Sequence, residues 1–452
     1  MEQLEINEIS SLAKPMQYLG AKNRVIELII SESKKYVNKG YVLDLFSGSS
    51  IVSQAYSNIG KNVISNDVQK FSGIISKTFL KIDFEPHFVD FPLDILFENS
   101  DDKYFRIYAD WIKKEELFLK ERDTKSLLNL YKNFPLIWNG KNNNSDEINN
   151  IFAKMRAHLN KPAFNTAPLF TTIYAGTYFG IKQSIQIDNH RRKLEELLKS
   201  DSINSWQYNL VLTSLISTIS QIVNSAGKHF AQPIKFENIL KNDLLESRLY
   251  KNRIIDVDTI LLENITNNIS VINNNTSPTN NIVLSKTMES ILKSVDDLPN
   301  IDLIYADPPY TAQQYSRFYH IPEILIDYSI PELQIHRDKV TTGLYPSDKF
   351  KSRFCSMTKV HEAFSDLLRL TKKTKSTLLL SYSKSLSDDN GNKRMITIKQ
   401  LEQLKEKIIP YYKMQIVELD LKYKQLNNQD AINQKTENIE VLIIFSKNNN
   451  NL

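Results

Sequence analysis

A rigid acidic loop follows one apolar stretch late in the chain. Asp307, Pro308, Pro309 and Tyr310 come directly after residues 301–306, which have the composition of a buried strand. Two consecutive prolines fix the backbone φ and cannot continue a paired strand, and a residue before proline is pushed toward an extended conformation. The sequence therefore predicts a stiff loop at the carboxyl end of a strand, which holds Asp307 and Tyr310 in fixed directions.

Such a loop suits chemistry on an exocyclic amine of a nucleic-acid base. That amine is a poor nucleophile because its lone pair is delocalised into the ring. Hydrogen bonds from its two N–H groups to Asp307 and to a nearby backbone carbonyl would draw the nitrogen toward tetrahedral geometry, which is catalysis by orientation and electrostatics. Tyr310 would stack on a base flipped out of the duplex. This chemistry needs no metal, and we expect none. The alternative interpretation of residues 307–310 is an ordinary Pro-Pro turn with an exposed aspartate.

A second group of polar residues follows two strands near the start of the chain. Residues 41–46 read as a strand, residues 51–59 have helical spacing, and residues 62–66 read as the next strand. Parallel sheets bind ligands beyond the carboxyl ends of their strands, where Asp44, Gly48 and Asp67 stand. Gly48 allows a tight turn, and Asp67 can accept hydrogen bonds from ribose hydroxyls.

The glycine content of this turn restricts the ligand. The loop has one glycine, whereas a dinucleotide fingerprint has three, and it lacks the lysine of a P-loop. A pyrophosphate ligand, and with it a nicotinamide dehydrogenase, is disfavoured. A nucleoside without phosphates, such as S-adenosyl-L-methionine, fits better. An ordinary strand–turn–helix with a capping serine is the other interpretation.

The remaining elements predict an α/β fold with an insertion. Further strands are expected at 282–284, 376–381, 414–421 and 439–445, and the last two could pair as a terminal antiparallel hairpin. Helices are expected at 104–120, 126–133, 147–159, 191–199 and 208–225, and the Asn-rich stretch 264–281 is expected to be a solvated loop. We therefore expect a catalytic domain from 1–85 and 282–452, with a mostly helical lobe at 86–281 inserted in it.

Three motifs resemble those of the Dam-like (alpha-group) N6-adenine DNA methyltransferases. They are residues 14–22, residues 44–49 and the complete catalytic motif 307–310; residues 440–447 also resemble the last strand of that family. The resemblance implies a Rossmann-like methyltransferase sheet that binds S-adenosyl-L-methionine. It implies that the cofactor site is formed by Tyr18, Gly20, Lys22, Asp44, Phe46, Gly48 and Asp67, and that the loop Asp307–Tyr310 holds the target base.

The match has departures and open assignments. Lys22 could instead be a solvated lysine at a helix start. Residues 285–289 place no acid directly at the strand end, where the family often has one near the cofactor adenine.

Candidate nucleic-acid contacts lie in two further segments. Tyr315 and Arg317 combine an aromatic ring with a cation after the catalytic loop, and Lys228 and His229 lie in the insertion. For each, a core or surface role is the alternative. The net charge of +5 suits a nucleic-acid partner without requiring one.

Together these features predict a site-specific adenine methyltransferase acting on double-stranded DNA in the cytoplasm, at the nucleoid. It would be the modification component of a restriction-modification or defence system, with a companion endonuclease encoded nearby. No stretch of about 18 apolar residues is present, so no membrane span is expected. Two alternatives remain: a methyltransferase acting on RNA bases, and a catalytically silent DNA-binding module with the same fold.

Overall fold

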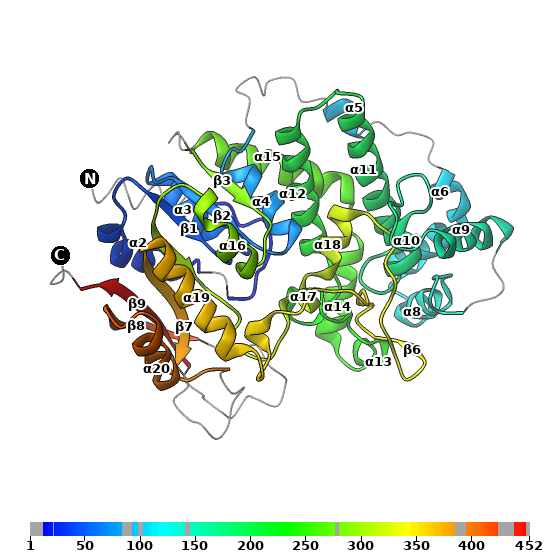
Figure 1. The fold of residues 1–452 in the computed structure, drawn as a ribbon. Coiled ribbons are helices and arrows are strands. Elements are labelled where there is room, and N and C mark those ends of the chain that lie inside the picture. Colours follow the sequence, from blue (N-terminus) through cyan, green and yellow to red (C-terminus); the bar gives the residue numbers. More distant parts are fainter. Residues whose placement is uncertain are drawn as a thin grey trace.

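The computed structural model describes residues 12–20, 22–83, 93–97, 103–140, 145–275, 280–384, 395–423 and 438–448. Its centre is a seven-stranded sheet. The strands are β1 (Tyr41–Asp44), β2 (Val63–Asn66), β3 (Ile282–Leu284), β4 (Ile301–Ala306), β7 (Thr377–Lys384), β8 (Tyr412–Tyr423) and β9 (Asn438–Lys447). Figure 1 shows the sheet in one half of the molecule and a group of helices in the other.

The strand order is β3-β2-β1-β4-β7-β9-β8. The first five strands are parallel, so their carboxyl ends meet at one edge of the sheet. β9 lies antiparallel between β7 and β8. This is a mixed α/β fold with a mostly parallel central sheet, which is consistent with a methyltransferase.

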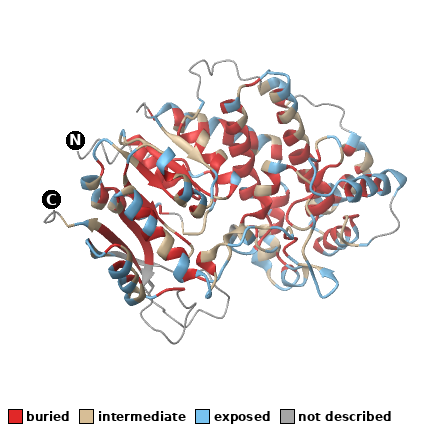
Figure 2. Cartoon of the chain, in the orientation of Figure 1, coloured by how far each residue is buried: buried red, intermediate tan, exposed pale blue. Residues whose placement is uncertain are grey.

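Both faces of the sheet are buried, and alternate side chains of a strand pack on opposite faces. Val42 and Leu303 belong to one apolar cluster, whereas their neighbours Leu43 and Ile304 belong to another. This period of two follows from the pleat of a strand. The flanking helices are α2 (Ile26–Ser33), α3 (Ile51–Asn58), α16 (Met288–Ser294), α19 (Val360–Thr374) and α20 (Ile398–Ile408). The first two contribute to the Val42 cluster and the other three to the Leu43 cluster, so the sheet is buried between two helical layers (Figure 2).

The residues between β2 and β3 that the structure describes are almost entirely helical. They form α4 (Lys70–Phe79), α5 (Leu93–Phe97), α6 (Lys103–Ile107), α7 (Ala109–Glu121), α8 (Thr124–Asn133), α9 (Asp146–Ala157), α10 (Leu169–Tyr174), α11 (Ile181–Lys199), α12 (Ser205–Ile222), α13 (Phe236–Ile239), α14 (Asp243–Arg253) and α15 (Val257–Asn273). Trp206 donates to the Thr78 carbonyl at 3.1 Å, which ties α12 to α4. The helix expected over 104–120 is interrupted, because Tyr108 turns out of helical conformation between α6 and α7.

The prediction of a solvated loop at 264–281 is wrong for its first part, since α15 continues to Asn273. Buried Ile265 and Ile272 face the helical core. The amides of Asn264 and Asn268 donate to the hydroxyls of Thr218 and Ser214 on α12, each at 3.0 Å. These asparagines are buried because α12 offers them hydroxyl partners, which composition alone does not reveal.

The segment after the catalytic loop packs on the helical half. It contains α17 (Tyr315–Phe318), α18 (His320–Asp327) and the short antiparallel pair β5 (Ile335–His336) and β6 (Lys339–Val340). Arg191 of α11 donates to the Leu325 carbonyl of α18 at 2.8 Å. Short 3-10 turns occur at η1 (Lys34–Tyr36), η3 (Ala226–Lys228), η4 (Val295–Asp297) and η5 (Arg353–Cys355). No helix among the described residues is long and apolar enough to cross a bilayer.

Candidate active site

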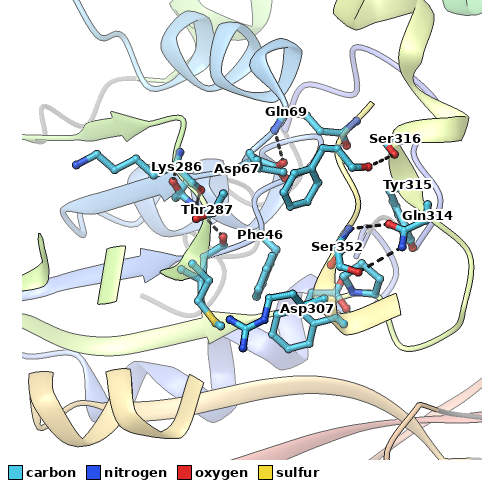
Figure 3. A pocket seen from close by; sticks show the side chains of 18 of the residues that line it. Phe46, Asp67, Gln69, Lys286, Thr287, Asp307, Gln314, Tyr315, Ser316 and Ser352 are labelled. Atoms are coloured by element: carbon cyan, nitrogen blue, oxygen red, sulfur yellow. Dashed lines mark hydrogen bonds between the residues drawn. The ribbon is translucent and has the colours of Figure 1, made fainter. Parts of the chain in front are cut away.

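A cleft opens at the edge where the parallel strands end. Its empty space, counted out to open solvent, is about 810 Å³. The lining residues are Tyr18, Leu19, Leu45, Phe46, Asn66, Asp67, Val68, Gln69, Lys286, Thr287, Met288, Glu289, Asp307, Pro309, Gln314, Tyr315, Ser316, Phe350, Ser352, Arg353 and Phe354. They come from the ends of β1, β2, β3 and β4 and from the segments around α17 and η5 (Figure 3).

Gly48 forms the turn after β1 and is held against an aromatic ring. Its φ is +51°, and a Cβ added there would lie 2.6 Å from Cε1 of Tyr18. Both the left-handed backbone and the close ring therefore require glycine. The Gly48 N–H donates to Asp67 Oδ2 at 2.9 Å, so the turn also orients a carboxylate that lines the cleft.

Asp67 follows β2 and projects into the cleft. Its Oδ1 accepts from the Gln69 N–H at 2.9 Å, and each carboxylate oxygen keeps a second lone pair. Burial raises the pKa of Asp67 to about 6, against the backbone hydrogen bonds that lower it.

Asp44 lies behind the cleft at the end of β1. Ser53 donates to its Oδ2 at 2.6 Å, and no residue in the described part of the chain hydrogen-bonds to its buried Oδ1. Burial raises the pKa of Asp44 to about 7.

One wall of the cleft is apolar. Phe46 meets Phe354 edge-on with the ring centroids 5.4 Å apart, and Met288 contributes to the same wall. Glu289, also in the lining, pairs with Arg353 at 2.7 Å. The sequence places no acidic residue directly at the end of β3. Glu289 nevertheless reaches the cleft, because α16 begins only a few residues after that strand. Phe354 and Arg353 carried no motif in the sequence.

Asp307 stands at the cleft with a buried ion pair behind it. Lys22 Nζ lies 2.9 Å from Asp307 Oδ2 and 2.6 Å from Glu440 Oε1. Burial raises the pKa of Asp307 to about 6, although the Lys22 charge opposes this shift. Burial alone would lower the pKa of Lys22, but the two carboxylates outweigh it and raise that pKa well above its ordinary value. Lys22 does not belong to the lining; it contacts the cleft through Asp307.

Aromatic side chains join the N-terminal segment to α17. Tyr18 stacks on Tyr319 with centroids 4.6 Å apart. The Leu19 N–H donates to the Tyr319 hydroxyl at 2.7 Å, and the Tyr315 hydroxyl donates to the Leu19 carbonyl at 3.4 Å. Tyr310 lies edge-on to Tyr382, with centroids 5.9 Å apart.

Six residues named from the sequence line the cleft together: Tyr18, Phe46, Asp67, Asp307, Pro309 and Tyr315. Gly20, Lys22, Asp44, Gly48, Pro308 and Tyr310 do not line it, although Lys22 and Gly48 contact residues that do. Gly20 has a φ of +78°.

The expected nucleic-acid contacts are less closely grouped. Arg317 is exposed, and its guanidinium lies 5.1 Å from the Tyr345 ring centroid. His229 meets Phe318 edge-on at 4.7 Å. Lys228 is in η3, and its side chain lies outside the described part of the structure.

The donor set of the cleft suits an organic cation with a nucleoside part. Asp67 can hold hydroxyl groups, the wall around Phe46 can cover an apolar ring, and Asp307 offers an acceptor. Phe46 lies between the two aspartates in Figure 3. Within the described ranges, no group of three or more His, Cys, Asp or Glu side chains could hold a metal ion.

Two comparisons with known proteins give a consistent result. Residues 18–161 match the family model of the D12 class N6 adenine-specific DNA methyltransferases. The chain is 23% identical over 434 residues to modification methylase LlaI of Lactococcus lactis subsp. lactis, covering 96% of this chain and 55% of the relative. It is also 23% identical over 370 residues to Type II methyltransferase M.FokI of Planomicrobium okeanokoites, covering 81% of this chain and 44% of that protein.

The chain thus spans about half the length of these relatives. The family match contains Tyr18, Gly48 and Asp67, and the longer alignment runs across Asp307, which lies outside the matched domain. The resemblance expected from the motifs is thus confirmed for residues 18–161, which match the D12 class of N6 adenine-specific DNA methyltransferases.

Proposed function

We propose that this protein methylates the N6 amine of adenine at a specific site in double-stranded DNA, with S-adenosyl-L-methionine as the methyl donor. The observation that carries this proposal is that Asp67 and Asp307, from loops 240 positions apart, line one cleft at the carboxyl edge of the sheet. The alternative arrangement, with the two loops at opposite ends of the sheet, would have left no common site.

The cleft suits the cofactor in charge and shape. Its carboxylates Asp67 and Asp307 favour a cationic ligand, since Glu289 is paired with Arg353. The wall of Phe46, Met288 and Phe354 can cover an adenine ring. Asp67 would bind the ribose hydroxyls. When bound, S-adenosyl-L-methionine supplies a methyl group activated by its sulfonium.

The chain's own residues would orient the target amine. The Asp307 carboxylate would accept a hydrogen bond from the amine. Lys22 contacts Asp307 Oδ2 and so limits the rotation of the Asp307 side chain. A nearby backbone carbonyl would be the second acceptor, and Pro309 keeps the loop rigid. Tyr310 would stack on the flipped base.

Three cations beside the cleft favour a polyanionic substrate. Arg317 and Lys349 lie 5.1 Å and 5.5 Å from the ring centroid of Tyr345. Burial, then the nearby charges of Lys351 and Arg317, lowers the pKa of Lys349. The cluster is tied to the cleft because the Ser316 hydroxyl donates to the Phe350 carbonyl at 2.6 Å. DNA phosphates would relieve the mutual repulsion of these charges.

We assign target recognition to the helical insertion, 86–281, and catalysis to 1–85 and 282–452. By analogy with the modification methylase among its relatives, the chain would protect host DNA against an endonuclease encoded nearby, in the cytoplasm at the nucleoid. Sequencing of the neighbouring genes tests this role, since the absence of any nuclease gene there contradicts it.

The activity is tested by long-read sequencing of DNA from cells that express the wild-type protein or Asp307→Ala. We expect modified adenine in one short sequence context with the wild type alone. Methylated cytosine instead would overturn the base assignment.

The two alternatives are tested with purified protein. Methylation of structured RNA but not of duplex DNA would favour an RNA substrate. Calorimetry that detects no binding of S-adenosyl-L-methionine would favour a silent DNA-binding module.

A further inference from the structure

A buried charge cluster joins three segments that are far apart in the sequence. Lys22 lies near the N-terminus, Asp307 follows β4, and Glu440 is on β9. The ammonium of Lys22 is 2.9 Å from Asp307 and 2.6 Å from Glu440, and the Lys22 side chain is 4% exposed. The Ser381 hydroxyl on β7 donates to Glu440 at 3.3 Å.

The charges of this cluster do not cancel. One ammonium shared by two carboxylates leaves one net negative charge. In the described part of the chain, Lys22 has no third carboxylate partner. Burying an excess charge costs free energy, and groups of this kind gather at functional sites, so the second carboxylate calls for an explanation.

We propose that Glu440 is a positioning residue that holds Lys22 against Asp307 and, by sharing its charge, keeps Asp307 a strong hydrogen-bond acceptor for the target amine. This inference rests on the proposed methyltransferase function. If Lys22 paired with Asp307 alone, it would neutralise the carboxylate. As the N–C bond forms and the methyl carbon–sulfur bond breaks, positive charge moves from the sulfur to the amine nitrogen, where a net negative cluster stabilises it.

The surroundings of Asp307 contain other titratable groups. Tyr305 on β4, Tyr310 in the loop and Tyr315 on α17 interact with the cluster electrostatically, and so does Asp44 at the end of β1. The raised pKa of Asp44 leaves it as a second group that titrates near neutral pH. Among the interactions on Asp307, the Lys22 charge lowers its pKa and the Glu440 charge raises it. Removal of the Glu440 charge therefore lowers the pKa of Asp307.

The test is Glu440→Gln, which removes the charge and keeps an oxygen that can accept from Lys22. The matched control is Glu402→Gln, at an exposed position of α20. Methyl transfer to a duplex carrying the mapped site is measured from pH 5 to 9 under saturating substrates. We expect kcat at neutral pH to fall roughly tenfold, KM for both substrates to stay within about twofold, and the acid limb to move to lower pH.

A role in stability alone predicts a different result. It would reduce the melting temperature, or activity at every pH, without moving the acid limb, and this outcome overturns the proposal. Difference infrared titration gives a readout besides activity: the carboxyl band absent from Asp307→Asn reports the protonation of Asp307. Its midpoint should move to lower pH in Glu440→Gln, and an unchanged midpoint contradicts the proposal.

The experiment distinguishes failure of the proposed role of Glu440 from failure of the proposed methyltransferase function. An active wild type with Glu440→Gln indistinguishable from Glu402→Gln overturns the role of Glu440 only. A wild type that methylates no nucleic acid overturns both.

Discussion

Asp307 interacts with a buried cation on one side and faces the cleft on the other. Lys22 contacts Oδ2 from within the protein, and the cleft needs the carboxylate as an acceptor. Because burial raises the pKa of Asp307 to about 6, the acceptor form is populated above that pH and lost below it. We expect kcat of the wild type to decrease as pH falls through about 6, as measured by transfer of labelled methyl groups to duplex DNA.

Asp307→Asn removes the charge at nearly constant shape. We expect kcat to fall by a factor on the order of 100 or more, the scale observed when one transition-state hydrogen bond is lost. Asp297→Asn, at an exposed site, is the control and should retain full activity. Activity of Asp307→Asn close to wild type would remove this carboxylate from the mechanism.

At the scale of elements, the turn after β1 depends on Tyr18. Gly48→Ala would place Cβ 2.6 Å from that ring on a backbone of φ +51°. Gly60→Ala is the matched control, because Gly60 has a φ of +77° but nothing within 4 Å of the added atom. We expect Gly60→Ala to cost about 1 kcal/mol through backbone strain, and Gly48→Ala about 1–3 kcal/mol more through overpacking.

Urea unfolding measures both variants, and calorimetry measures their binding of S-adenosyl-L-methionine. Gly48→Ala should also weaken cofactor binding, because the Gly48 N–H orients Asp67. Equal destabilisation by the two substitutions would show that the Tyr18 contact has no energetic weight.

The buried asparagines of α15 give a stability prediction with a control in the same helix. Asn268→Ala removes a buried hydrogen bond to Ser214 and should reduce the free energy of unfolding by about 1–2 kcal/mol. Asn267→Ala is on the exposed side of the same helix and should be neutral or slightly stabilising, since alanine is the better helix former. Chemical denaturation of both variants tests this, and the reverse order of stability would contradict it.

At the scale of the whole molecule, DNA must reach the cleft past Arg317, Lys349 and Lys351. Replacing all three by Gln should weaken DNA binding and reduce the slope of log affinity against log salt by about 3, roughly one for each lost phosphate contact. Binding of S-adenosyl-L-methionine should not change.

Three exposed lysines of α20 and β8, Lys399, Lys407 and Lys413, provide the control for this charge change. They lie on elements at the far edge of the sheet (Figure 1), so their replacement by Gln should leave the salt slope unchanged. Equal effects of the two triple variants would mean that only net charge matters.

The sequence by itself determined features that depend on neighbouring residues. The double proline after Asp307 dictates a stiff loop, the apolar stretch 301–306 predicts a buried strand, and Gly48 predicts a tight turn. The resemblance to the adenine methyltransferases also followed from motifs of adjacent residues, and residues 18–161 match the model of that family.

Only the tertiary structure decided which distant groups meet. The partners of Lys22 are Asp307 and Glu440, which lie hundreds of positions away. The sequence therefore could not show whether Lys22 is buried in an ion pair or solvated at the start of a helix. Asn264 is buried in a helix, where Thr218 on another helix accepts a hydrogen bond from its side-chain amide. The physical reason is common to both: a polar side chain is buried where folding supplies a partner, and that partner is invisible to patterns that compare only adjacent residues.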